Sequence, residues 1–198
     1  GALALNVAAP DEGNVNLFHQ VATEEQKARW LPRIVSGEVR SVFSMTETNT
    51  DGAGADPSLL KTEARAVEGG YSITGRKYMI SGVVGARLNI VMARTFDRAG
   101  ADVGATMFLV DMDAPGFLIE RMLETIDSNH PGGHAEVSFE NVFVAADQVL
   151  GQAGAGFRNA QVRLGPARLT HCMRWLGLAN RAHAIGWQDQ VHHDERLA

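Results

Sequence analysis

The hydrophobic period changes twice along this chain, and that change limits the possible folds more than any other feature. Residues 23–38 carry apolar side chains at helical spacing. From Val39 to about Val149 the chain shows short alternating or apolar runs separated by turn residues, a pattern typical of β-strands. The helical spacing returns at about Gly156. The pattern therefore predicts a β block with a helical segment on each side.

Local signals mark where the helical segments start and end. Thr23 and Gln26 have the spacing of a capping box, and Gly37 is a typical helix stop. Pro32 should kink the first segment or divide off a short first portion. The second segment contains Gly165-Pro166, where we expect a kink. Its last residues carry no stop signal, which indicates a chain cut out of something longer.

The β block contains seven strand-like runs joined by short links. A tight hairpin is expected at Glu68-Gly69-Gly70. Because no helical segment separates the runs, they favour an antiparallel barrel or sandwich over a Rossmann-type parallel sheet. The runs are RSVFSMT, KTEARAV, YSITGRKYMIS, RLNIVMART, ATMFLVD, FLIERML and HAEVSFENVFV.

Composition argues against several classes of protein. The 198 residues carry a formal net charge of -5 without a dense run of Lys and Arg, so nucleic acid is not expected as a partner. No apolar segment approaches the roughly 20 residues of a membrane-spanning helix, and Gly1 opens no secretory signal peptide. The single cysteine, Cys172, leaves no intrachain disulfide and no cysteine-based zinc cluster. We expect a soluble protein.

Two motifs suggest a cofactor or metal site but fail on spacing. The run GQAGAGF precedes a helix, yet its G-x-x-G-x-G spacing and the lack of a following helix–strand unit argue against dinucleotide binding. His130 and His134 surround Pro131-Gly132-Gly133, which cannot place them on one helix face as a zinc pair requires. We therefore expect no metal site.

Two strand ends combine apolar atoms with hydroxyls. The run FSMTETNTDGAGAD, residues 43–56, passes through Thr46 into a loop with more glycine and hydroxyl residues than a turn requires, here called the glycine loop. The run GRKYMISG ends a strand at Ser81. A planar heteroaromatic cofactor needs such an edge, with apolar atoms against its face and hydroxyls near its ring nitrogens. Two ordinary strand ends would have the same composition, so the pattern alone leaves both interpretations open.

The chain as a whole resembles the acyl-CoA dehydrogenase family. The resemblance is carried, in order, by EEQKARWLPRIVSGEVRSVFSMTE with its glycine loop, YSITGRKYMISG, APGFLIERM, AEVSFENVFV and GQAGAGF, and it covers nearly all 198 residues. Three further strings are similar to a long-chain branch whose members are sometimes fused to a kinase-like domain: APDEGNVNLFH, PGGHAEV and RLGPARLTHCMR.

The resemblance implies an α+β multidomain fold with an N-terminal helical domain, a central antiparallel β-barrel and a C-terminal helical bundle. FAD would lie between the barrel and the C-terminal helices. Residues 1–38 would end the first domain, 39–150 would form the barrel, and 151–198 would supply the first helix of a truncated third domain. Family members are commonly dimers or tetramers, so a homodimer or homotetramer is expected.

The implied activity is α,β-dehydrogenation of an acyl-CoA thioester in fatty acid β-oxidation. A carboxylate removes the α-proton, a hydride passes to flavin N5, and an electron-transferring flavoprotein accepts the electrons. An acyl-CoA oxidase that passes electrons to O₂ and a non-catalytic paralogue are the alternatives. The location would be cytoplasmic in a bacterium, and mitochondrial or peroxisomal in a eukaryote.

The resemblance also carries over site residues by their positions in the motifs. Ser81 would lie near flavin N5, and Arg168 is the clearest polar contact to the substrate. The full set of implied flavin contacts is Phe43, Met45 and Thr46 on the pyrimidine side, with Met79, Ile80 and Ser81. The implied substrate contacts are Ala55, Gly165, Pro166, Ala167 and Arg168.

Departures from the family pattern bear on activity. The glycine loop has a short insertion, Thr48 in place of a proline and Ala55 in place of a serine. Met79 stands where a tryptophan is common, so it keeps an apolar contact without an aromatic stack. Most members carry the catalytic base on a late loop, and a minority place a glutamate where this chain has Ala167. The base is therefore expected beyond residue 198.

Overall fold

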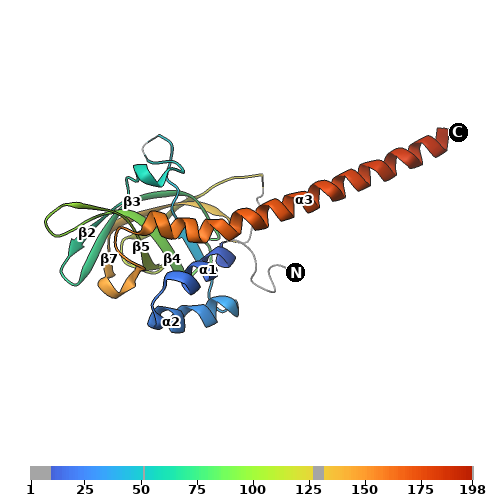
Figure 1. Cartoon of the computed structure of the whole chain (residues 1–198). Coiled ribbons are helices and arrows are strands. Elements are labelled where there is room, and N and C mark those ends of the chain that lie inside the picture. Colours follow the sequence, from blue (N-terminus) through green and yellow to red (C-terminus); the bar gives the residue numbers. More distant parts are fainter. Residues whose placement is uncertain (1–9, 51, 127–131, 198) are drawn as a thin grey trace. The chain divides into compact units, whose positions relative to one another are not determined.

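A computed structural model describes residues 10–50, 52–126 and 132–197, with side chains described as far as residue 187 (Figure 1). Two helices precede the sheet, α1 at Asp11–Val21 and α2 at Glu24–Val35. The capping box of Thr23 is confirmed, and Gly37 follows the C-cap of α2 with a φ of 77°. The helix continues through Pro32, so no separate first portion forms.

Helix α1 was not predicted by apolar spacing because the face that it buries is partly polar. Asp11 and Asn14 are buried together with Leu17 and Phe18. Asp11 Oδ1 accepts hydrogen bonds from the backbone N–H and hydroxyl of Ser41, at 2.7 and 2.6 Å. A helix with such contacts lacks the continuous apolar stripe by which helices are predicted.

All seven strand-like runs form strands, and they belong to one eight-stranded sheet (Figure 1). The two residues Glu68 and Gly69 link an antiparallel pair, which confirms the predicted hairpin. The path of paired strands is β6-β7-β3-β2-β4-β5-β8, with β1 beside β4. The bounds are β1 Ser41–Ser44, β2 Glu63–Val67, β3 Gly70–Ser81, β4 Leu88–Phe96, β5 Asp102–Asp111, β6 Phe117–Met122, β7 His134–Ala145 and β8 Val149–Leu150, with short 3-10 turns at Pro57–Leu59 and Ala146–Gln148.

The expected architecture is confirmed, but the sheet differs from an antiparallel barrel in two respects. Strands β1 and β2 both pair with β4 in parallel. Within the described part of the chain, no ladder joins β6 to β8, so the barrel is not closed. Parallel neighbours need a long connection between them, and here the chain between β2 and β4 runs through β3.

Two apolar clusters form the core, and β4 contributes to both because its side chains alternate. Val91 and Ala93 belong to the first cluster, which is built from strand residues such as Ile73, Phe108 and Val137. Ile90 and Met92 belong to a second cluster that includes residues of α1 and α2, such as Phe18, Trp30 and Ile34.

Helix α3 spans Gly156–Leu197 and continues through Gly165-Pro166, so the helix is not interrupted there. The chain divides into two compact units, Gly1–Arg163 and Leu164–Ala198. The domain boundaries expected near residues 38 and 150 stay predictions. Among the described residues, no helix is both long and apolar enough to cross a membrane.

Candidate functional site

The two strand ends singled out from the sequence are joined by hydrogen bonds. The backbone N–H of Tyr78 donates to the carbonyl of Thr46 over 2.9 Å. The Lys77 ammonium donates to the carbonyl of Met45 over 3.0 Å. Because β1 and β3 are not partners in the sheet, these two bonds hold the end of β1 against the end of β3.

The joined ends present apolar atoms and hydroxyls that are only partly covered. Phe43, Met45, Thr46 and Ser81 are half-buried, and Met79 is 42% exposed. Ile80 differs, because its side chain is buried in the first apolar cluster. Only its backbone could contact a ligand. The mixture fits the face and edge of a planar heteroaromatic cofactor, which needs apolar contacts beside hydrogen-bonding groups.

Met79 occupies a strained position in a β-bulge. Lys77 pairs with Val137 and Ile80 pairs with Ala135, so Tyr78 and Met79 together oppose a single residue of β7. Met79 has a φ of 58°, in the left-handed region that a non-glycine residue rarely adopts. Bulges re-aim the chain next to functional sites, and strain of this kind concentrates there.

A buried ion pair lies directly behind the strand ends. Lys77 Nζ and Glu47 Oε1 are 3.0 Å apart, and the two side chains are 0% and 2% exposed. Glu47 also accepts the backbone N–H groups of Ala53, Lys61 and Thr62, each at 2.9 Å. One carboxylate thus anchors the strand end, the lysine of β3 and both sides of the glycine loop.

This arrangement explains the glycines of the loop. A Cβ on Gly52 would lie 2.5 Å from Glu47 Cβ. Gly54 has a φ of 58°, and its Cβ would lie 2.3 Å from Asn49 Oδ1. Glycine at these two positions lets the loop pack closely against Glu47 and Asn49, and Ala55 is exposed.

The charges of this pair are fixed by opposing effects. Burial favours the neutral carboxyl of Glu47, but the Lys77 ammonium and the N–H groups of Lys61 and Thr62 outweigh it and lower the pKa of Glu47 to about 2. Burial lowers the pKa of Lys77 to about 8, against the attraction of Glu47. Both groups are therefore predominantly charged at neutral pH.

Ser81 is directly opposite a histidine. Its Oγ lies 2.8 Å from His134 Nδ1, and the two residues are register partners in β3 and β7. His134 is 9% exposed. His130, the other histidine of the HPGGH motif, lies outside the described residues. Within the described part of the chain, no group of three or more His, Cys, Asp and Glu residues could hold a metal ion.

Arg163 lies against Phe43 at the joined strand ends, and the sequence reasoning did not single it out. Its Nε donates to Asn14 Oδ1 over 2.8 Å, and its guanidinium lies 4.2 Å from the centroid of the Phe43 ring. Burial lowers the pKa of Arg163 to about 10, against the attraction of Glu12 and Asp11. The signal in the sequence was an arginine three residues after Ala160, close to the apolar face of α3.

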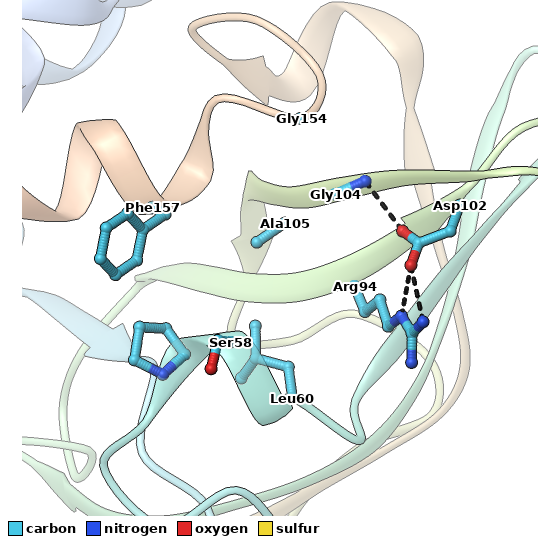
Figure 2. A pocket seen from close by; sticks show the side chains of 9 residues that line it. Ser58, Leu60, Arg94, Asp102, Gly104, Ala105, Gly154 and Phe157 are labelled. Atoms are coloured by element: carbon cyan, nitrogen blue, oxygen red, sulfur yellow. Dashed lines mark hydrogen bonds and ion pairs between the residues drawn. The ribbon is translucent and has the colours of Figure 1, made fainter.

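A pocket of about 410 Å³ opens in the first unit (Figure 2). An ion pair of 2.6 Å between Arg94 and Asp102 lies on one side, with the ring of Phe157 on another. Phe157 comes from the GQAGAGF run and is 53% exposed. The sequence reasoning did not predict this pocket. Its lining residues are Pro57, Ser58, Leu60, Arg94, Asp102, Gly104, Ala105, Gly154 and Phe157.

The expected substrate residues fall in different units. Ala55 belongs to the first unit, and the run Gly165 to Arg168 lies on α3 in the second. Their expected meeting at one substrate stays a prediction.

Known proteins resemble this chain in sequence and in fold. A family model described as acyl-CoA dehydrogenase, middle domain, matches residues 42–142. "Probable acyl-CoA dehydrogenase FadE2" from Mycobacterium tuberculosis is 43% identical over 191 residues, covering 92% of this chain and 45% of that protein.

Two solved structures extend the comparison. Butyryl-CoA dehydrogenase from Megasphaera elsdenii has a TM-score of 0.70 and 30% identity, covering 82% of this chain and 41% of that one. A glutaryl-CoA dehydrogenase from Mycobacterium smegmatis, solved in complex with FADH2, has a TM-score of 0.66 and 28% identity, covering 78% of this chain and 37% of that one. The chain thus spans less than half the length of each of these relatives.

Proposed function

The chain belongs to the acyl-CoA dehydrogenase family, and from that membership we propose that it forms part of an FAD-dependent enzyme that dehydrogenates an acyl-CoA thioester. The observation that carries the proposal is the joined pair of strand ends, which offers apolar atoms and hydroxyls on one edge. Bound FAD would supply the hydride acceptor for the β-hydrogen of the substrate.

Each residue of the edge has a proposed role toward FAD. Phe43, Met45 and Met79 would contact the ring with apolar atoms, and the hydroxyls of Thr46 and Ser81 would bind its polar edge. The Glu47–Lys77 pair would hold the two strand ends at a fixed spacing. Preorganisation of this kind is what a precise cofactor site requires.

The pocket of Figure 2 is the proposed place for the polar part of the thioester substrate. The Arg94–Asp102 ion pair and the Ser58 hydroxyl offer polar groups to the substrate, and Phe157 suits apolar atoms. Ala55 is the proposed substrate contact of the first unit, and the proposed contacts on α3 are Gly165, Pro166, Ala167 and Arg168. The base that removes the α-proton would lie outside the 198 residues.

We propose the physiological setting from the same family membership. An electron-transferring flavoprotein would accept the electrons, the enzyme would be a homodimer or homotetramer, and the pathway would be fatty acid β-oxidation.

The test is whether the purified full-length protein contains FAD and loses its yellow colour anaerobically with acyl-CoA thioesters. We expect denaturation to release FAD, and we expect thioesters of matching chain length to bleach the flavin absorbance. Rapid reoxidation by air would instead favour an oxidase. A colourless protein that takes up no FAD would overturn the proposal.

A further inference from the structure

We infer that His134 is a positioning residue for the FAD site, which fixes the direction of the Ser81 hydroxyl through the hydrogen bond between Ser81 Oγ and His134 Nδ1. The inference rests on the proposed function, because it takes Ser81 to face the flavin. It adds a third strand, β7, to β1 and β3, the strands whose ends form the site.

The backbone aligns the two side chains on both sides of the contact. Ser81 and His134 are direct partners in the β3–β7 ladder. Just beyond Ser81, the backbone N–H of Gly82 donates to the carbonyl of Gly133 over 2.7 Å, and that of Val84 donates to the carbonyl of Gly132 over 3.1 Å. The two glycines of the HPGGH motif therefore hold the chain after Ser81 in place through backbone hydrogen bonds.

These backbone hydrogen bonds require glycine at position 132. A Cβ on Gly132 would lie 2.9 Å from Gly82 backbone atoms, and the φ of Gly132 is 77°. Any L side chain at this position would collide with the backbone of Gly82 and Val84, directly after β3. The motif that first suggested a metal site thus brings His134 to Ser81.

The chemistry of the contact suits a flavin edge. An isolated serine hydroxyl can take three staggered orientations, and a bond to the imidazole selects among them. If Nδ1 carries the proton and donates to Ser81, the hydroxyl proton is left for an acceptor. If Nδ1 accepts instead, the serine oxygen is left for a donor. Flavin N5 accepts a hydrogen bond when oxidised and carries a proton when reduced, so the pair can match either state.

A second polar pair on the same two strands provides a matched control. Thr74 Oγ1 and Asn141 Oδ1 are 3.3 Å apart across β3 and β7. Thr74 lies seven positions before Ser81 in the same strand and is exposed. Removing its hydroxyl perturbs the same ladder at a distance from the proposed site.

The experiment uses the full-length, FAD-loaded protein and measures the FAD dissociation constant by flavin fluorescence, together with the flavin absorbance spectrum. We expect Ser81→Ala and His134→Leu each to weaken FAD binding by about two- to tenfold, the range for one neutral hydrogen bond. Both variants should shift the flavin absorbance in the same direction. The double variant should be no worse than Ser81→Ala, and Thr74→Ala should match the wild type.

Two polar replacements of His134 separate positioning from folding. In His134→Asn the amide lies where Nδ1 lies, and we expect FAD affinity within about twofold of the wild type, below the loss of one hydrogen bond. In His134→Gln the amide lies near Nε2, and we expect the defect of Ser81→Ala. This contrast holds even where His134→Leu folds poorly.

The results that would overturn the inference differ from those that would overturn the function. A wild-type protein that does not bind FAD contradicts the proposed function. A wild type that binds FAD while His134→Gln keeps wild-type affinity and spectrum contradicts the role of His134 alone. Equal defects in the Asn and Gln variants, or additive defects in the Ser81–His134 double variant, also overturn it.

Discussion

Met79 adopts a left-handed backbone, with a φ of 58°, in the bulge next to Ser81. For a non-glycine residue this conformation costs about 1–2 kcal/mol. Met79→Gly removes that cost but adds about 0.5–1 kcal/mol of entropy loss on folding. We therefore expect the free energy of unfolding of Met79→Gly to stay within about 1 kcal/mol of the wild type. Met79→Val should be less stable than Met79→Gly in urea denaturation.

Leu118 provides the control for this comparison. It is an exposed apolar residue of β6 without a positive φ. There the β-branched residue suits the strand and glycine does not, so Leu118→Val should be more stable than Leu118→Gly. If valine were also better than glycine at Met79, the bulge would carry no strain.

Single residues of the site differ in how far sequence reasoning could reach. Thr46 and Ser81 could be proposed because each follows an apolar residue at the end of a strand-like run. Glu47 could not, because an acidic residue in a polar loop is typical of an exposed position, and only the structure shows three backbone N–H groups around it. The signal for a buried carboxylate was Lys77. It lies four residues after the buried Ile73, so its side chain points to the same, inward face of β3 and needs a partner there.

At the scale of elements, the Glu47–Lys77 pair connects the ends of β1 and β3. Glu47→Gln leaves the Lys77 charge buried without its partner, and we expect it to lower the free energy of unfolding by about 3–5 kcal/mol. The double variant Glu47→Gln/Lys77→Met removes both charges and should lose less than Glu47→Gln alone. Urea denaturation of the wild type and the variants measures the difference.

An exposed ion pair of similar geometry provides the control. Arg87 and Asp113 are 2.6 Å apart, with side chains 63% and 71% exposed. Asp113→Asn should cost less than about 1 kcal/mol because solvent screens the pair. A loss in Glu47→Gln as small as that in Asp113→Asn would contradict the proposed coupling of the strand ends.

Elements were predictable where one physical pattern dominated. The seven main strands followed from alternation and turn residues, and α2 followed from its capping box and apolar face. Helix α1 was not predicted because it buries the polar residues Asp11 and Asn14 against Ser41. Strand β8 has two residues, too few to show any period. The parallel pairing of β1 and β2 with β4 is a long-range property that local periodicity does not contain.

At the scale of the whole molecule, the same ion pair predicts how stability depends on pH. The pKa of Glu47 is lowered from 4.5 to about 2 in the folded state. Between these values the unfolded state binds more protons, so stability falls as the pH falls. The contribution is complete above about pH 4.5 and lost near pH 2. At about 1.4 kcal/mol for each unit of pKa, it is on the order of 3 kcal/mol.

The double variant Glu47→Gln/Lys77→Met isolates this contribution. The exposed carboxylates Glu25, Asp56 and Asp102 also have lowered pKa values, but they are present in both proteins and cancel in the comparison. Urea denaturation between pH 7 and pH 2 should show a smaller loss of stability on acidification in the double variant than in the wild type. Equal losses would mean that Glu47 keeps an ordinary pKa and that the glycine loop does not depend on its charge.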